Sequence, residues 1–115
     1  MGKIIHVELT SAAPQETADF YARAFGWQAE TSPFVPDYLV ASTGDGPGID
    51  AAIMSSGYQS QNTIIWIEVD DIEAAIDAVT AAGGSAAGPV QDIPDGRVAY
   101  VTDTAGVVIG LKQPR

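Results

Sequence analysis

The feature that most constrains this chain is an internal repeat. Residues 4–9 (IIHVEL) and 64–69 (IIWIEV) share one pattern of apolar and polar residues. The repeat extends beyond these two stretches when Ile64 is placed on His6, a shift of 58 residues that offsets the two stretches by two positions. This shift aligns identical residues at Asp19 and Asp77, Ala24 and Ala82, Gly26 and Gly84, Pro36 and Pro94, Asp45 and Asp103, and Gly48 and Gly106. Most matches fall on helix ends and turns, where backbone geometry restricts residue choice. They favour a repeated architecture over chance in an alanine-rich chain.

Each copy of the repeat predicts a strand, a helix and three further strands. In the first copy we expect strands at 4–9, 27–31, 38–43 and 48–54, and a helix that begins near Pro14 and ends at Gly26. A polar stretch at 55–62 has the composition of a linker. In the second copy we expect strands at 64–69, 85–90, 97–102 and 107–112. Its helix should begin with Asp70 as the capping carboxylate, three residues before Glu73, and end at residues 83–84.

Length and charge narrow the class of protein. The 115 residues, 46% of them hydrophobic, predict a single domain over 1–115. The formal net charge of −10 repels phosphate backbones and anionic membranes, so we expect neither a nucleic-acid nor a membrane partner. Cysteine is absent, which excludes disulfides and thiolate chemistry. With no signal peptide and no long apolar run, the sequence predicts a cytoplasmic protein.

Strand alternation places the side chains of the first predicted strand, residues 4–9, on two opposite faces. Ile5, Val7 and Leu9 share an apolar face, whereas His6 and Glu8 share the other. A carboxylate beside the chain's only histidine would raise the imidazole pKa and orient it as an acid or a base, so His6 and Glu8 are the candidate catalytic residues. The alternative is a solvated or hydrogen-bonded pair without chemistry.

Several motifs resemble those of the vicinal oxygen chelate superfamily. They are Asp19-Phe20-Tyr21, Phe25-Gly26-Trp27 and the run from Thr102 to Gly106 before the last strand. The superfamily includes glyoxalase I, extradiol dioxygenases, and fosfomycin-resistance and bleomycin-binding proteins. The resemblance implies an α+β fold of two tandem βαβββ modules that form a curled-sheet cleft. The modules would cover about 3–54 and 63–112. One such fold hosts many chemistries, so the resemblance alone does not identify the reaction.

The resemblance also implies where a metal would bind. Metal-using members of the superfamily take ligands at positions that correspond to His6, Ala52, Ile64 and Gly110. Only His6 can ligate, and a catalytic divalent metal normally takes about three protein ligands. Glu8, Asp50 and Glu68 offer oxygens from neighbouring positions. We therefore expect no metal and no other cofactor, since no phosphate loop, dinucleotide fingerprint or nucleophile elbow is present either.

These features favour a small-molecule binding protein that sequesters or carries an apolar or aromatic compound. Trp66 would supply a stacking surface, or else fill the core, while Glu68 and Asp50 would contact polar groups of the ligand. The alternative function is a lyase, isomerase or dioxygenase that works through His6 and Glu8, with or without a divalent metal. A scaffold without a ligand is a third class. For Arg97 and Lys112, surface ion pairs are favoured over ligand anchoring.

We also expect a homodimer, because each module leaves a sheet edge open and superfamily members pair modules within or between chains.

Overall fold

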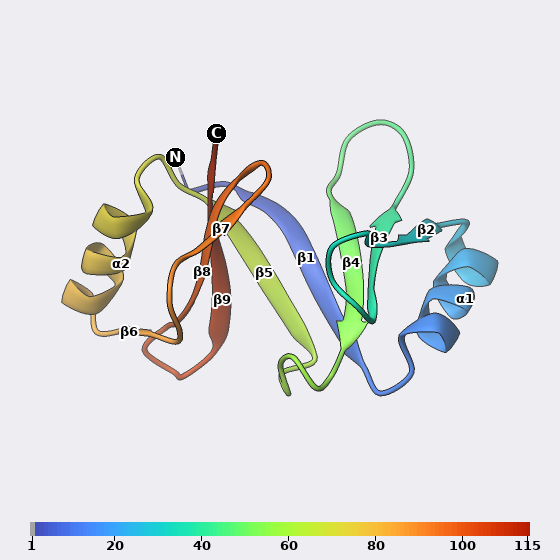
Figure 1. The fold of residues 1–115 in the computed structure, drawn as a ribbon, viewed down its shortest axis with the longest axis horizontal. Coiled ribbons are helices and arrows are strands. Elements are labelled where there is room, and N and C mark those ends of the chain that lie inside the picture. The colour runs from blue at the N-terminus through green and yellow to red at the C-terminus, as the bar shows by residue number, and fades with distance from the viewer. Residues whose placement is uncertain (1) are drawn as a thin grey trace. The chain divides into compact units, whose positions relative to one another are not determined.

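In the computed structural model, which describes residues 2–115, the chain divides into two compact units. The first unit runs over His6–Ile64, and the second joins Ile65–Arg115 to the residues up to Ile5. Each unit has one helix lying along one face of its own sheet (Figure 1). None of the helices in the described part of the chain is long and apolar enough to cross a membrane.

The first unit contains most of β1 and the four elements after it. Its elements are β1 (Ile4–Ser11), α1 (Pro14–Phe25), β2 (Gln28–Thr31), β3 (Tyr38–Ser42) and β4 (Asp50–Ser55). The strands lie in the order β2-β3-β4-β1. Strands β1 and β4, the first and last of the unit, pair in parallel, whereas β3 pairs antiparallel with both β2 and β4.

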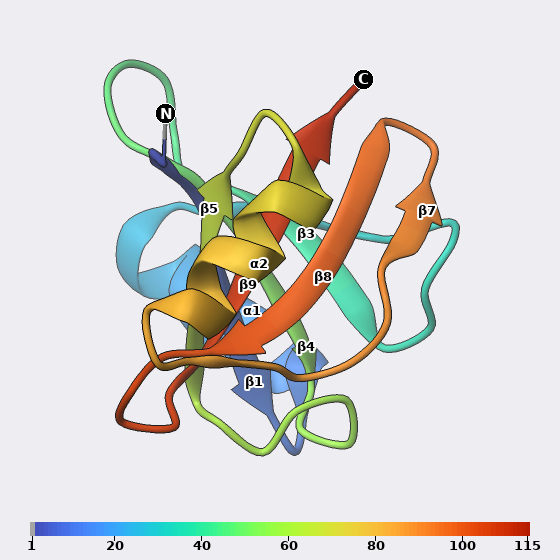
Figure 2. The same ribbon diagram turned by 90° about the vertical axis from the view of Figure 1, so that its left-hand side faces the viewer.

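The second unit repeats this arrangement. Its elements are β5 (Thr63–Glu68), α2 (Ile72–Ala81), β6 (Ser85–Ala86), β7 (Gln91–Ile93), β8 (Gly96–Thr102) and β9 (Val108–Pro114). Strands β5 and β9 pair in parallel, β8 pairs antiparallel with β9, and β6 and β7 both pair with β8. In Figure 2, α2 crosses in front of β5, β8 and β9. The predicted α+β fold of two βαβββ modules is confirmed.

One predicted strand was wrong. The single strand expected over 85–90 is two short strands, β6 and β7, that use different parts of β8. The break contains Pro89, which has no N–H to donate to a ladder, preceded by Gly88 at φ 150°. Together β6 and β7 take the place that β2 has in the first unit.

The helix ends follow from the residues at their termini. Pro14 opens α1, and Gly26 closes it in the left-handed conformation with φ 76°, as expected. The N-cap of α2 is Asp71 rather than Asp70, because the Asp71 carboxylate is the one that accepts a hydrogen bond from the Ala74 N–H, at 3.1 Å. The helix therefore begins one residue later than the sequence suggested.

Each helix covers an apolar core of its own unit. In the first unit Leu9 packs against the buried Ala18, Leu39 and Ile53. In the second, Ile72, Ile76 and Val79 of α2 pack in a cluster with Val69, Ala99, Val101 and Leu111. Ile72 is completely buried, which stabilises the fold by about 2 kcal/mol relative to an exposed side chain. The strand faces turned toward the helices are thus the apolar ones deduced from alternation.

Candidate functional site

Glu8 is the buried charged residue of the first unit. Its neighbour Leu9 packs under α1, so Glu8 projects from the opposite face of β1, where only 3% of the residue is exposed. The Tyr38 hydroxyl on β3 donates a hydrogen bond to Glu8 Oε2 at 2.7 Å. Because a buried carboxylate is costly without such donors, this contact fixes both the position and the orientation of Glu8. Tyr38 was not among the expected site residues.

His6 and Asp50 are neighbours across β1 and β4. They are register partners in the parallel ladder, two pairs before Glu8 and Ala52. Asp50 is exposed, and its Oδ1 accepts hydrogen bonds from the Thr43 N–H at 3.1 Å and from the Thr43 hydroxyl at 3.5 Å. Asp50 thereby holds the β3–β4 connection in place. The structure thus brings together three of the expected site residues, His6, Glu8 and Asp50, on two adjacent strands.

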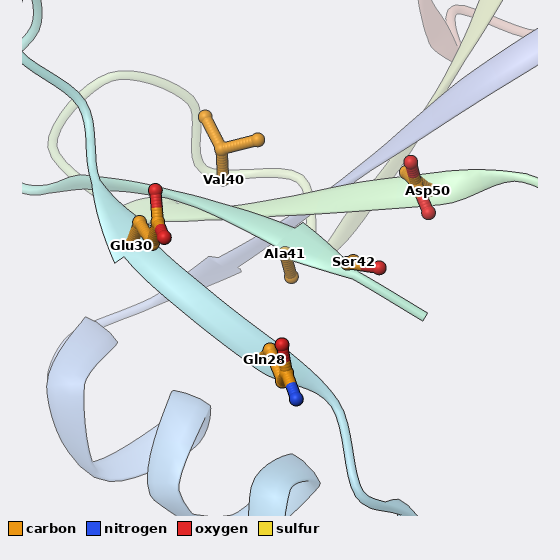
Figure 3. Close-up of a pocket in the computed structure, with 6 residues that line it drawn as sticks. All are labelled: Gln28, Glu30, Val40, Ala41, Ser42 and Asp50. Atoms are coloured by element: carbon orange, nitrogen blue, oxygen red, sulfur yellow. The ribbon is translucent and has the colours of Figure 1, made fainter. Parts of the chain in front are cut away.

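A hollow of about 240 Å³ lies beside Asp50 (Figure 3). It is shallow, and the residues that line it come from β2, β3 and the start of β4: Gln28, Glu30, Val40, Ala41, Ser42 and Asp50. The sequence analysis did not single out Gln28, Glu30 or Ser42. The signal that would have found them is the alternation of polar residues along β2, since Gln28 and Glu30 must share a face when Ala29 packs on the helix.

Trp66 is the corresponding large side chain in the second unit. It projects from β5 away from the α2 core, is only 7% exposed, and lies 5.2 Å from Tyr100 between ring centroids, at a tilt of 57°. The indole also covers Gly110, its register partner on β9, so closely that a Cβ at Gly110 would overlap the ring. The ring therefore packs on the protein itself and is not an open stacking surface. Its role in binding remains a prediction.

The remaining expected residue, Glu68, lies next to Lys112 in the β5–β9 register. Its backbone N–H donates to the Lys3 carbonyl, and its carbonyl accepts from the Gly2 N–H. The Glu68 side chain is half-buried at the end of β5. The structure therefore places Trp66 and Glu68 on one face of one strand, as alternation predicted.

Two cations of the second unit, Arg97 and Lys112, are engaged in ion pairs, as expected. Arg97 contacts Glu73 at 2.6 Å and Asp92 at 3.5 Å, and Lys112 Nζ lies 2.7 Å from Asp95 Oδ2. The hydrogen bond from Arg97 lowers the pKa of Glu73, and that from Lys112 lowers the pKa of Asp95. These contacts offset the charge of both cations locally, so neither is an unengaged anchor for an anionic ligand.

The positions that the resemblance assigns to metal ligands do not fit a metal. Ala52 and Ile64 are fully buried and have no donor atom, and the indole of Trp66 covers Gly110. Within residues 2–115, no group of three or more histidine, aspartate and glutamate side chains is placed to hold a metal ion. His6 alone cannot supply the donor set that a catalytic metal requires. No catalytic step is therefore assigned to a metal.

Known proteins share both sequence and fold with this chain. It is 33% identical over 115 residues to "Putative glyoxylase CFP32" of Mycobacterium tuberculosis, an alignment that covers 93% of the chain. The chain spans only 44% of the length of that relative. It is also 31% identical over 128 residues to "Probable lactoylglutathione lyase" of Vibrio parahaemolyticus, covering 97% of the chain and 91% of the relative.

Solved structures share the fold at lower identity. Methylmalonyl-CoA epimerase from Mycobacterium tuberculosis matches with a TM-score of 0.74 and 15% identity, over 99% of this chain and 88% of the other. A methylmalonyl-CoA epimerase in complex with methylmalonyl-CoA and NH4+ matches with a TM-score of 0.68 and 15% identity, over 99% and 95%. A family model matches residues 3–111. The chain therefore belongs to the Glyoxalase/Bleomycin resistance protein/Dioxygenase superfamily, known also as the vicinal oxygen chelate superfamily.

Proposed function

We propose that this chain binds a small, largely apolar organic molecule on the sheet faces that turn away from its helices, and that it does so without a metal. The observation that carries the proposal is the buried Glu8 carboxylate, held by the Tyr38 hydroxyl at 2.7 Å on the face opposite the α1 core. Burying a charge costs free energy, and this face of the sheet adds nothing to the core beneath the helix that would offset that cost. Such a group is typical of a recognition site.

The polar residues of the first unit would meet one end of the ligand. His6 and Asp50 are register partners beside Glu8, so a ligand hydroxyl or amine at this end would find carboxylate and imidazole acceptors on two strands. In the second unit, Trp66 and Glu68 lie on one face of β5 and would offer an aromatic ring and a carboxylate to a ligand of the same kind. The protein would then sequester or carry its ligand.

The charge of the ligand follows from the charge of the chain. The formal net charge is −10, and Arg97 and Lys112 are engaged by Glu73, Asp92 and Asp95. A ligand with several phosphate charges would be repelled. We therefore propose that the ligand is neutral or cationic, in contrast to the methylmalonyl-CoA bound by the epimerase of similar fold.

Analysis of the protein as purified tests this proposal. Elemental analysis should find transition metal far below one ion per chain, and native mass spectrometry should find any co-purified compound to be neutral or cationic. Stoichiometric zinc, iron, nickel or manganese that disappears in His6→Ala would contradict the metal-free proposal. Methylmalonyl-CoA should not shift the thermal midpoint; a clear stabilisation would contradict the proposed ligand charge.

Matched tyrosine variants test the site itself. Tyr38→Phe removes the hydroxyl that orients Glu8, whereas Tyr58→Phe removes one that donates to the Pro36 carbonyl in an exposed connection. Affinity for a co-purified compound, or for a hit from a neutral-fragment screen, should fall about five- to tenfold in Tyr38→Phe and stay unchanged in Tyr58→Phe. Equal affinities in the two variants would place binding elsewhere.

A metal-free enzyme is the second candidate, favoured by the same buried carboxylate. Glu8 is fixed by Tyr38 and shares its face with His6 two residues away, which is the arrangement that acid–base catalysis needs. The names of the Vibrio and mycobacterial relatives suggest which assay comes first. Lactoylglutathione lyase activity that is lost in Glu8→Gln and retained in Asp92→Asn would establish this candidate over sequestration.

We further propose that the chain forms a single domain, with modules at about 3–54 and 63–112 and a linker at 55–62, and that it works as a cytoplasmic homodimer. Strand β2 ends the strand order of the first unit and leaves an edge to cover. Light scattering should give twice the chain mass of 11.9 kDa. A mass of 11.9 kDa across micromolar concentrations would refute the dimer.

A further inference from the structure

The indole N–H of Trp66 is a buried hydrogen-bond donor without an acceptor. Its Nε1 has less than 1 Å² of exposed surface and no hydrogen-bond partner among the described residues. Buried polar groups are nearly always paired, because an unpaired donor loses its bond to water and gains nothing in return. An unpaired buried donor therefore needs a reason, and one that is common in binding sites is an acceptor supplied by the ligand.

The surroundings of the ring allow such an acceptor to arrive. One side of the indole rests on Gly110, where the absence of a side chain leaves only backbone beneath the fused ring edge. Tyr100, tilted at 57° and 5.2 Å away, contacts the ring without stacking flat upon it. No side chain at Gly110 blocks a displacement of the ring on that side.

From these observations we infer that Trp66 donates a hydrogen bond to an oxygen of the ligand, of the carbonyl class, and that the indole shifts over Gly110 to admit it. This inference rests on the proposed function, since it assigns Trp66 a contact with a ligand of the proposed kind. It adds a chemical requirement to the proposed ligand: its largely apolar body carries an acceptor oxygen. A hydrocarbon of the same shape would bind more weakly.

The test removes the donor and keeps the ring. Trp66 is replaced site-specifically with 3-benzothienylalanine, in which sulfur takes the place of the indole N–H. Two neutral probes are compared by calorimetry: 1-acetylnaphthalene, and 1-isopropenylnaphthalene, in which a methylene replaces the carbonyl oxygen. The unsubstituted protein should bind the ketone about fivefold more tightly than the alkene, and the benzothienyl variant should bind both equally.

The thermal midpoints of the benzothienyl variant and the parent, measured without ligand, provide an independent test. Since the N–H makes no bond in the free protein, the benzothienyl variant should be at least as stable as the parent. A lower midpoint would mean that the N–H already bonds within the protein, for example to the Tyr100 ring, and would overturn the inference.

The binding results test the inference about Trp66 and the proposed function separately. A ketone preference that survives in the benzothienyl variant overturns the inference and leaves the proposed function intact. Failure of both probes to bind the unsubstituted protein contradicts the proposed function and the inference together.

Discussion

The two units share a backbone but differ at equivalent positions of their opening strands. The 58-residue shift that carries the start of α1 onto that of α2, and the start of β4 onto that of β9, carries Glu8 onto Trp66 and Ala52 onto Gly110. In the first unit a carboxylate is held by Tyr38, whereas in the second an indole lies flat over a glycine. One fold thus holds a buried, hydrogen-bonded carboxylate in one half and a packed aromatic ring in the other.

The helix-facing sides of the two sheets show no such divergence. Leu9 in the first unit and Ile67 in the second both pack into the core beneath their helix. This face must exclude water and fill space, so apolar residues suffice. The opposite face lies outside this core, and its residues differ between the two units.

The largest expected effect tests whether the glycine of the second unit is required by the indole. Gly110→Ala would place a methyl group inside the volume of the Trp66 ring, where it can be accommodated only by moving the whole indole. We expect a loss of about 2 to 3 kcal/mol in the free energy of unfolding, measured by chemical denaturation, because overpacking forces side chains off their preferred rotamers.

The matched control is the equivalent position of the first unit. Ala52 is fully buried yet already carries a Cβ, so Ala52→Gly should cost only about 1 kcal/mol, from backbone entropy and a lost methyl contact. If Gly110→Ala lowered the free energy of unfolding as little as Ala52→Gly, the two units would differ at this position in residue type but not in how tightly the position is packed.

The next effect concerns the carboxylate of the first unit. Tyr38→Phe removes the hydroxyl that donates to Glu8 Oε2 and should lower the free energy of unfolding by about 2 kcal/mol, the usual cost of losing a hydrogen bond to a buried charged group. The double variant Tyr38→Phe with Glu8→Gln should recover part of this loss, since a neutral amide needs the donor less. Full additivity of the two changes would show that the contact contributes nothing.

The smallest effect tests the ion pairs of the second unit. Asp95→Asn removes the partner of Lys112, and because the Asp95 side chain is 71% exposed the expected loss at neutral pH is about 0.5 kcal/mol. The lowered pKa of Asp95 means that the parent gains stability above the unfolded-state pKa and loses it as the pH falls through the folded value. The difference in thermal midpoint between the parent and Asp95→Asn should therefore vanish in acid. A difference that grows in acid would mean that the ionised Asp95 does not stabilise the folded protein.

Local chemistry made most of the fold predictable. Gly26 ends α1 because a left-handed residue costs glycine little, and strand alternation assigned Leu9 and Glu8 to opposite faces. The split of the predicted strand at 85–90 was missed, although Pro89 carried the signal. Reading that proline as a strand breaker would have corrected the boundary.

The site was harder to predict because its contacts depend on register. Tyr38 meets Glu8 across 30 residues of sequence, and only the pairing of β3 with β4 and of β4 with β1 brings the two strands into one sheet. The burial of Trp66 likewise depends on Gly110, which lies 44 positions later and faces it only through the β5–β9 register. Alternation gives the face of a side chain, but not its neighbour on the next strand.

The hydrogen bonds from residues 2–3 to Glu68 have a consequence for the order of folding. The Gly2 N–H and the Lys3 carbonyl bond to Glu68 at the end of β5, so residues 2–3 belong to a unit whose other residues, 65–115, are synthesised only after His6–Ile64. His6–Ile64 can collapse as soon as it has been synthesised, while the residues before it wait for Ile65 and beyond. Closing that long loop costs entropy before its contacts form, so the second unit should set the refolding rate.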